Sequence, residues 1–151
     1  MSSSENRENT TCPVARSVDI IGVQTCALPI LIVRDAFDGT SRFSDFQRSL
    51  GIARNILSDR LHKLLNSGIL TTQSASDGTA YQEYVLTEKG QRLFPVVVAL
   101  RQWGEQHLFA DGERHSVLID KRTQRPVPVM TPMTEDGLPL NFHEAKVQKI
   151  K

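Results

Sequence analysis

The chain has 151 residues, of which 39% are hydrophobic, a length and composition typical of a single domain that buries a core. Its formal net charge at pH 7 is +1, so an argument for or against DNA must rest on where individual charges lie. The longest apolar runs, 27–33 and 94–100, fall short of the about 20 residues that a membrane span needs. No secretory signal is recognisable, and we expect a cytoplasmic protein whose Cys12 and Cys26 are thiols.

The first third of the chain predicts a polar tail and two helices. Residues 1–11 offer almost no apolar side chains and are expected to be a disordered tail. Residues Cys12–Ile21 carry apolar residues at helical spacing and predict a short amphipathic helix. A second apolar stretch, Leu31–Phe37, ends at Asp38 and Gly39, where glycine allows a helix to stop.

Two further helices follow, separated by a glycine. Ser41 is expected to cap a short helix that ends before Gly51. The segment 53–67 has the clearest helical periodicity of the chain, with leucines on one face and polar side chains on the other. Two helices joined in this way predict a helix-turn-helix.

A hairpin and a long helix come next. Residues Ile69–Gln73 and Tyr81–Leu86 predict two strands joined by a polar loop, the order expected of a wing. Thr87 is expected to cap a last helix that runs from Glu88 to about Phe109. Pro95 must either kink this helix or lie close enough to its start to be tolerated.

The remaining segment, 110–151, has a different character. Residues Val117–Asp120 and Val127–Thr131 predict short strands, and Asp136 with Gly137 predicts a turn. We expect a small β-rich appendage that does not contact DNA, because it lies beyond the last helix.

Several strings of the chain stand in a characteristic order and spacing: Cys12–Ala15, Leu31–Phe37, Arg42–Phe46, Ala53–Leu61, Gly68–Leu70 and Tyr84–Gly90. Together these strings resemble the HxlR family of bacterial winged-helix regulators. The resemblance implies an α+β, mainly helical fold: a winged helix-turn-helix over 12–109 with a long C-terminal dimerisation helix. It also implies a DNA-binding homodimer that represses or activates transcription, with the first and last helices forming the dimer contact.

One stretch, Gly22–Ile30, departs from the family pattern. It is longer than the family segment, lacks its aromatic residue, and reads like the in-frame translation of a sequencing adapter. We therefore expect it to be foreign to the working protein and to lower its stability through Pro29. The second helix should then begin late, near Ala27 or after Pro29, with Gly22–Cys26 as an irregular loop.

The helix within 53–67 is the predicted recognition element. A helix that enters the major groove needs short polar side chains that reach base edges, and cations that meet phosphates. An ordinary solvated helix face, with Arg60 paired to an acidic neighbour, is the alternative. A wing loop with Asp77 and without Lys or Arg is not expected to enter the minor groove. The predicted DNA-binding residues are Ser41, Arg42, Arg54, Asn55, Ser58, Arg60, His62 and Lys63.

Other chemistries find little support. The four histidines lack the paired spacing of a zinc site, and no nucleophile elbow or phosphate-binding glycine loop is present in the sequence. We expect no metal, no cofactor and no enzymatic activity. Cys12 opens the first helix and is either a thiol sensor of a redox signal or a small buried hydrophobe at the dimer contact. The regulator is expected to respond to a redox or small-molecule signal. The alternative function is a winged-helix protein–protein interaction module without DNA binding.

Overall fold

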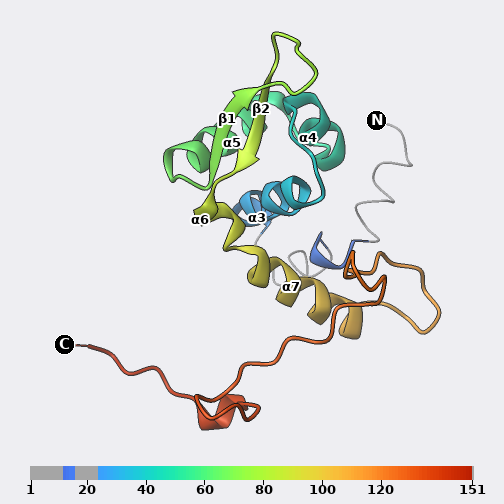
Figure 1. Cartoon of the computed structure of the whole chain (residues 1–151), viewed down its shortest axis with the longest axis vertical. Coiled ribbons are helices and arrows are strands. Elements are labelled where there is room, and N and C mark those ends of the chain that lie inside the picture. The colour runs from blue at the N-terminus through green and yellow to red at the C-terminus, as the bar shows by residue number, and fades with distance from the viewer. Residues whose placement is uncertain (1–11, 16–23, 151) are drawn as a thin grey trace. The chain divides into compact units, whose positions relative to one another are not determined.

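The computed structural model describes residues 12–15 and 24–150. The chain divides into two compact units, Met1–Ser116 and Val117–Lys151 (Figure 1). The predicted tail at 1–11 and most of the predicted first helix lie outside the described residues, although residues 13–15 are helical.

The first unit contains a helix-turn-helix followed by a hairpin and a helix, as predicted. Its elements are α3 (Gln24–Phe37), α4 (Phe43–Leu50), α5 (Arg54–Asn66), β1 (Leu70–Ser74), β2 (Gln82–Leu86), α6 (Glu88–Gln91) and α7 (Phe94–His107). Gly51 ends α4 in the left-handed conformation, with φ 62°, and its N–H donates to the carbonyl of Gln47 at 2.9 Å. The predicted turn between the two helices is therefore confirmed.

Helix α3 is the centre of the first unit. It contacts α4, α5, β2 and α7, and in Figure 1 it lies between α7 and the group formed by the hairpin, α4 and α5. Ile32 of α3, Phe46 of α4 and Leu57 and Leu61 of α5 are fully buried in one core. Burying each such side chain contributes about 1.5 to 3 kcal/mol to the free energy of folding. The spacing of the leucines in α5 therefore determines which face of this helix is buried.

The hairpin is antiparallel, with a register that runs from Leu70 opposite Leu86 to Ser74 opposite Gln82. Thr87 caps the helix that follows, as predicted, because its hydroxyl accepts from the N–H of Gly90 at 3.1 Å. The same hydroxyl donates to the carbonyl of Gly68, so the cap also joins the end of β2 to the start of β1.

The last helix is divided at Arg92 and Leu93 into the short α6 and the longer α7. Pro95 lies in the first turn of α7, where its missing N–H leaves no hydrogen bond unmade. Of the two positions that the sequence allowed for Pro95, the start of a helix is the one observed.

The predicted helix cap at Ser41 is wrong. Arg42 is the N-cap residue of α4, and it makes no side-chain capping hydrogen bond. Instead the carbonyl of Ser41 accepts from the N–H of Tyr84 at 2.7 Å. This main-chain bond holds the residue before α4 against β2, which ties the helix-turn-helix to the hairpin.

The second unit is held by turns rather than by strands. The strands predicted at Val117–Asp120 and Val127–Thr131 are reduced to one isolated bridge between Ile119 and Pro126. A second bridge joins Met133 and Pro139, and the short η1 (Phe142–Glu144) follows it. The turn predicted at Asp136 and Gly137 is confirmed by a hydrogen bond from the N–H of Gly137 to the carbonyl of Thr134 at 3.0 Å.

The predicted late start of the second helix is also wrong. Helix α3 begins at Gln24, so residues expected in an irregular loop are helical and Pro29 lies inside the helix. Gly22 and Val23 lie outside the described residues. A proline this close to the helix start removes only the hydrogen bond to the carbonyl of Thr25, and the first turn has few constraints that prevent it from tilting away.

We expect Pro29→Ala to stabilise the protein, because an interior proline costs a helix about 3 kcal/mol relative to alanine and part of that cost is relieved by tilting. The free energy of unfolding, measured by urea denaturation, should rise by about 1 to 3 kcal/mol. Pro95→Ala is the matched control and should change it by less than about 1 kcal/mol, because Pro95 occupies a first turn. A loss of stability in Pro29→Ala would show that the segment 22–30 is fitted to this fold.

Candidate nucleic-acid interface

The exposed face of α5 is built by the burial of its opposite face. Leu57, Leu61 and Leu64 pack into the core, which turns the residues between them outward. Asn55, Ser58 and His62, spaced three or four residues apart, share one face and are all exposed. In the part of the chain that the structure describes, none of these polar side chains is engaged in a hydrogen bond or ion pair.

The predicted cations of α5 are paired. The carboxylate of Asp59 accepts from Arg60 at 2.5 Å and lies 3.2 Å from the ammonium of Lys63. These contacts, chiefly the hydrogen bond from Lys63, lower the pKa of Asp59 below its ordinary value. The pairing of Arg60 is what the solvated-face alternative predicted. Arg60 follows Asn55 by five residues, so it lies on a different flank of the helix.

Two arginines mark the starts of the two helices. The guanidinium of Arg54, at the start of α5, lies 4.9 Å from the ring centroid of Phe43, which is the first residue of α4. Arg42, just before α4, pairs with Asp77 of the wing loop and lies 5.6 Å from the ring centroid of Tyr81. Both cations are therefore held against aromatic side chains next to the exposed face of α5.

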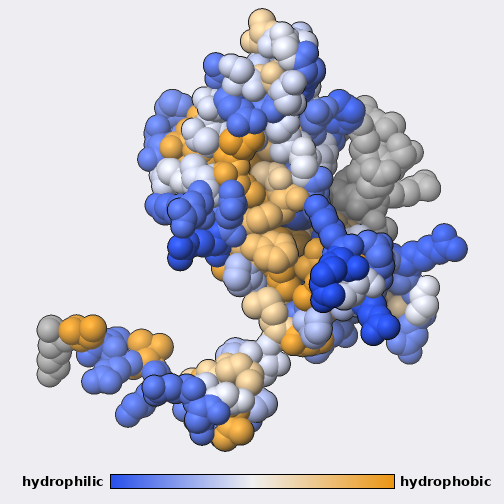
Figure 2. Space-filling view, viewed as in Figure 1, coloured by the Kyte–Doolittle hydropathy of each residue, from blue (hydrophilic) through white to orange (hydrophobic). Residues whose placement is uncertain are grey.

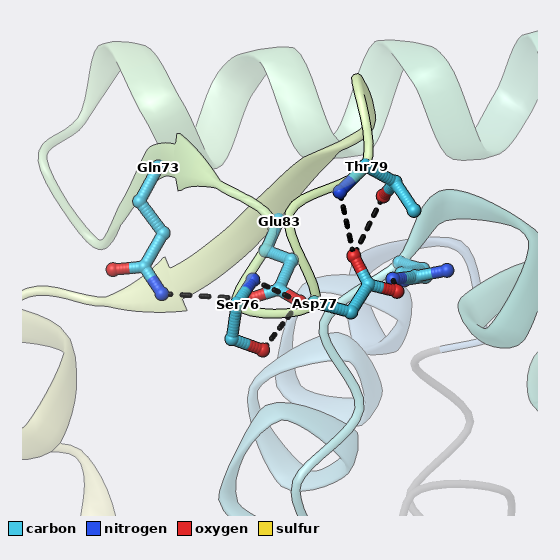
Figure 3. Close-up of polar contacts among 6 residues, drawn as sticks. Gln73, Ser76, Asp77, Thr79 and Glu83 are labelled. Atoms are coloured by element: carbon cyan, nitrogen blue, oxygen red, sulfur yellow. Dashed lines mark hydrogen bonds and ion pairs between the residues drawn. The ribbon is translucent and has the colours of Figure 1, made fainter.

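Two carboxylates, Asp77 of the wing loop and Glu83 of β2, accept hydrogen bonds that order the loop between β1 and β2 (Figure 3). Asp77 accepts from the hydroxyl of Thr79 at 2.7 Å and from its N–H at 3.0 Å. These bonds, together with Arg42, lower the pKa of Asp77 to about 2. Glu83, which is buried, accepts from the N–H and hydroxyl of Ser76 and from the amide of Gln73. The loop is thus ordered around negative charge.

Cys12 lies apart from these residues, beside the last part of α3. Its sulfur accepts from the guanidinium of Arg34 at 3.2 Å, and Arg34 also donates to Asp35 at 2.6 and 2.8 Å. Burial lowers the pKa of Arg34, but Asp35 and Cys12 raise it above its ordinary value. Sequence reasoning missed this cluster, although two charged residues within an apolar helical stretch are a recognisable signal.

The structure therefore brings together most, but not all, of the predicted site. Asn55, Ser58 and His62 share one face, with Arg54 and Arg42 beside the helix starts. Within residues 12–15 and 24–150, no group of His, Cys, Asp or Glu side chains could hold a metal ion. The described helices are also too short or too polar to cross a bilayer.

Comparison with known proteins places the matching region over these elements. Residues 28–111 match the family model described as HxlR-like helix-turn-helix. The chain is 39% identical over 95 residues to the HTH-type transcriptional regulator Rv3095 of Mycobacterium tuberculosis, a match that spans 63% of this chain and 58% of that relative.

Two solved structures share the fold over more of the chain. The crystal structure of PA1607, a candidate transcription factor, is 43% identical with a TM-score of 0.76 and covers 96% of this chain and 99% of that one. PA1374 of Pseudomonas aeruginosa, also a candidate transcription factor, is 36% identical with a TM-score of 0.61 and covers 91% of this chain and 92% of that one.

Proposed function

The chain belongs to the HxlR-like helix-turn-helix family, and on that premise we propose that it is a cytoplasmic, non-enzymatic transcriptional regulator that binds operator DNA as a homodimer. The observation that carries this proposal is the exposed face of α5, where Asn55, Ser58 and His62 are polar, adjacent and without intramolecular partners among the described residues. The names of the relatives support it, since Rv3095 is described as a transcriptional regulator.

The side chains of this face suit different tasks. An asparagine amide can both donate to and accept from an adenine edge in the major groove, so we assign base reading to Asn55. Ser58 and His62 lie on the same face and can contact neighbouring bases. We assign phosphate contacts, which position a protein without reading sequence, to Ser41, Arg42, Arg54 and Lys63. Arg60, on another flank, suits a phosphate at the edge of the interface.

Helix α7 supports the homodimer. Val97 and Val98 face the core, whereas Val96 and Trp103 remain 45% and 41% exposed. Together with Pro95, Ala99 and Leu100 they line an almost wholly apolar groove of about 530 Å³. In Figure 2 an orange band crosses the first unit from the level of the hairpin to α7, on a surface that is otherwise largely blue and white. A second copy of the same helix would cover such a face in a two-fold dimer.

A protein–protein interaction module remains the second candidate, and the wing favours it. Asp77 is the only charged residue of the loop, Arg42 is paired with it, and Asp59 lies between two cations of α5. Exposed ion pairs of this kind are weak, so phosphates can compete for the same arginines and lysines. For that reason we favour DNA.

Responsiveness to a redox signal is part of the proposal. Reactive cysteines occupy partly exposed, electropositive surroundings, and Cys12 is partly exposed with the Arg34 guanidinium against its sulfur. Val14, two residues later, is fully buried in the core, so a modification of Cys12 would disturb the packing of the N-terminal segment.

Asn55→Ala should weaken binding to the specific site by about 1 to 3 kcal/mol and leave binding to random DNA almost unchanged, because only base contacts are lost. Gel shifts would compare the fragment upstream of the protein's own gene with a random duplex of equal length. Asn66→Ala is the matched control at the other end of α5, and it should leave both affinities unchanged. Equal losses of affinity for the two duplexes would show that Asn55 does not contact bases specifically.

Trp103→Asp should separate the homodimer, because it places a charge in the apolar groove of α7. In sedimentation equilibrium the variant should show the 16.9 kDa of one chain, and the parent should show twice that mass. Gln106→Asp adds the same charge to an exposed position of α7 outside the groove and should leave the dimer intact. A dimeric Trp103→Asp variant would place the interface elsewhere.

Cys12→Ser should abolish release of DNA by hydrogen peroxide, which oxidises a thiolate to a sulfenic acid and is itself reduced to water, whereas the parent should lose binding and regain it after reduction by a thiol. The readout is the affinity for the upstream fragment before oxidation, after it, and after reduction. Cys26→Ser provides the matched control and should respond like the parent. If Cys12→Ser also responds like the parent, Cys12 is only a packing residue of the N-terminal segment.

A further inference from the structure

The turn between Asp120 and Arg125, in the second unit, is closed by its own hydrogen bonds. The N–H of Asp120 donates to the carbonyl of Arg125 at 2.9 Å, and the N–H of Gln124 donates to the carbonyl of Asp120 at 2.8 Å. The side chain of Gln124, a residue with φ 57°, donates to the carbonyl of Lys121 at 2.8 Å. The bridge between Ile119 and Pro126 fixes the base of this hairpin turn.

Three cations lie on this short turn without an ion-pair partner among the described residues. Lys121, Arg122 and Arg125 are exposed, and across the described part of the chain none of their side chains takes part in an ion pair or hydrogen bond. The nearest acidic residue in sequence, Asp120, is occupied otherwise: its carboxylate accepts from the N–H of Arg122 at 2.7 Å and of Thr123 at 3.4 Å. The turn therefore presents three unpaired cations, and a net positive charge, on a hydrogen-bonded frame.

The wing loop and the cations Arg60 and Lys63 of the first unit differ in this respect. Its wing loop carries Asp77 and no cation of its own, and Arg42 is paired with that aspartate. On α5 the cations Arg60 and Lys63 share Asp59. In a chain with a net charge of only +1, the 121–125 turn places three unpaired cations within five residues, a spacing that complements a row of phosphates.

We propose that the turn formed by Lys121, Arg122 and Arg125 binds the phosphate backbone of duplex DNA and supplies the sequence-independent contact that the acidic wing does not. This inference rests on the proposed function. It replaces the expectation that the appendage makes no DNA contact, which was based only on its place after the last helix. Because phosphate contacts do not read bases, the turn should affect all duplexes equally.

The test is the salt dependence of binding by the full-length protein. The variant Lys121→Gln/Arg122→Gln/Arg125→Gln keeps the backbone hydrogen bonds of the turn and should melt like the parent. Fluorescence anisotropy would measure the affinity for a duplex of arbitrary sequence of about 30 base pairs, long enough for two half-sites one helical turn apart, over a series of KCl concentrations. Each phosphate contact contributes about 0.9 to the slope of log K against log salt concentration.

For the triple variant the slope should become shallower by about 2 to 3 for each turn that engages, and the affinity at low salt should fall at least about tenfold. Arg122→Gln and Arg125→Gln alone should each lower the slope by about 1 for each turn that engages. The control Arg114→Gln/Lys146→Gln/Lys149→Gln removes the same charge from exposed positions outside the turn and should keep the parental slope.

The outcomes separate this inference from the proposed function. An unchanged slope in the triple variant, with parental binding and an Asn55→Ala defect both present, overturns the role of the turn alone. Equal changes of the slope in the triple variant and in its control would show that only the net charge of the protein matters. That result also overturns the role of the turn. A parent that binds no duplex at any salt concentration overturns the proposed function, and the role of the turn with it.

Discussion

The close approach of Gly90 to the carbonyl of Ile69 fixes the geometry on which the first unit depends. A Cβ atom at Gly90 would lie 2.2 Å from that oxygen, so only glycine fits there. Thr87 strengthens the same junction, because its N–H donates to the carbonyl of Ile69 at 3.1 Å. Ile69 follows the end of α5 and Gly90 lies in α6, so the proposed recognition helix and the helices that lead to α7 are joined at one point.

The electrostatics of the candidate interface follow from exposed pairs rather than from net charge. Asp59 is paired with Arg60 and Lys63, and Asp77 is paired with Arg42. These three ion pairs lie on the surface and involve cations that could otherwise contact phosphates. Surface ion pairs are weak and are screened by salt. They order the arginine and lysine side chains but leave them available to bind a phosphate. Binding would then exchange an intramolecular carboxylate for a phosphate, and the low net charge of the chain would limit non-specific affinity.

Sequence patterns predicted the elements whose burial is periodic. The predicted bounds of α5, β1 and β2 lie within about a residue of those observed. The leucine pattern located α5 because one face of the helix is buried, and the polar loop located the ends of the two strands. The sequence misled where tertiary contacts compete with local preference. Ser41 suits a helix cap, but its carbonyl is bound by Tyr84, which is distant in sequence. Pro29 favours a helix end, but the apolar residues after it bury α3 in the core.

The second unit shows a different reason for failure. Its apolar alternation predicts strands, but Pro126 and Pro128 lack the N–H groups that a ladder needs, so only an isolated bridge forms. Many of its apolar side chains remain exposed, including Phe142 at 83%. Order in this segment comes from side chains that accept main-chain hydrogen bonds, such as Asp120 and Thr134. Asp120 of the 120–125 turn accepts main-chain hydrogen bonds and forms no ion pair with the cations of the turn. The interactions that shape the turn therefore also leave its cations unpaired.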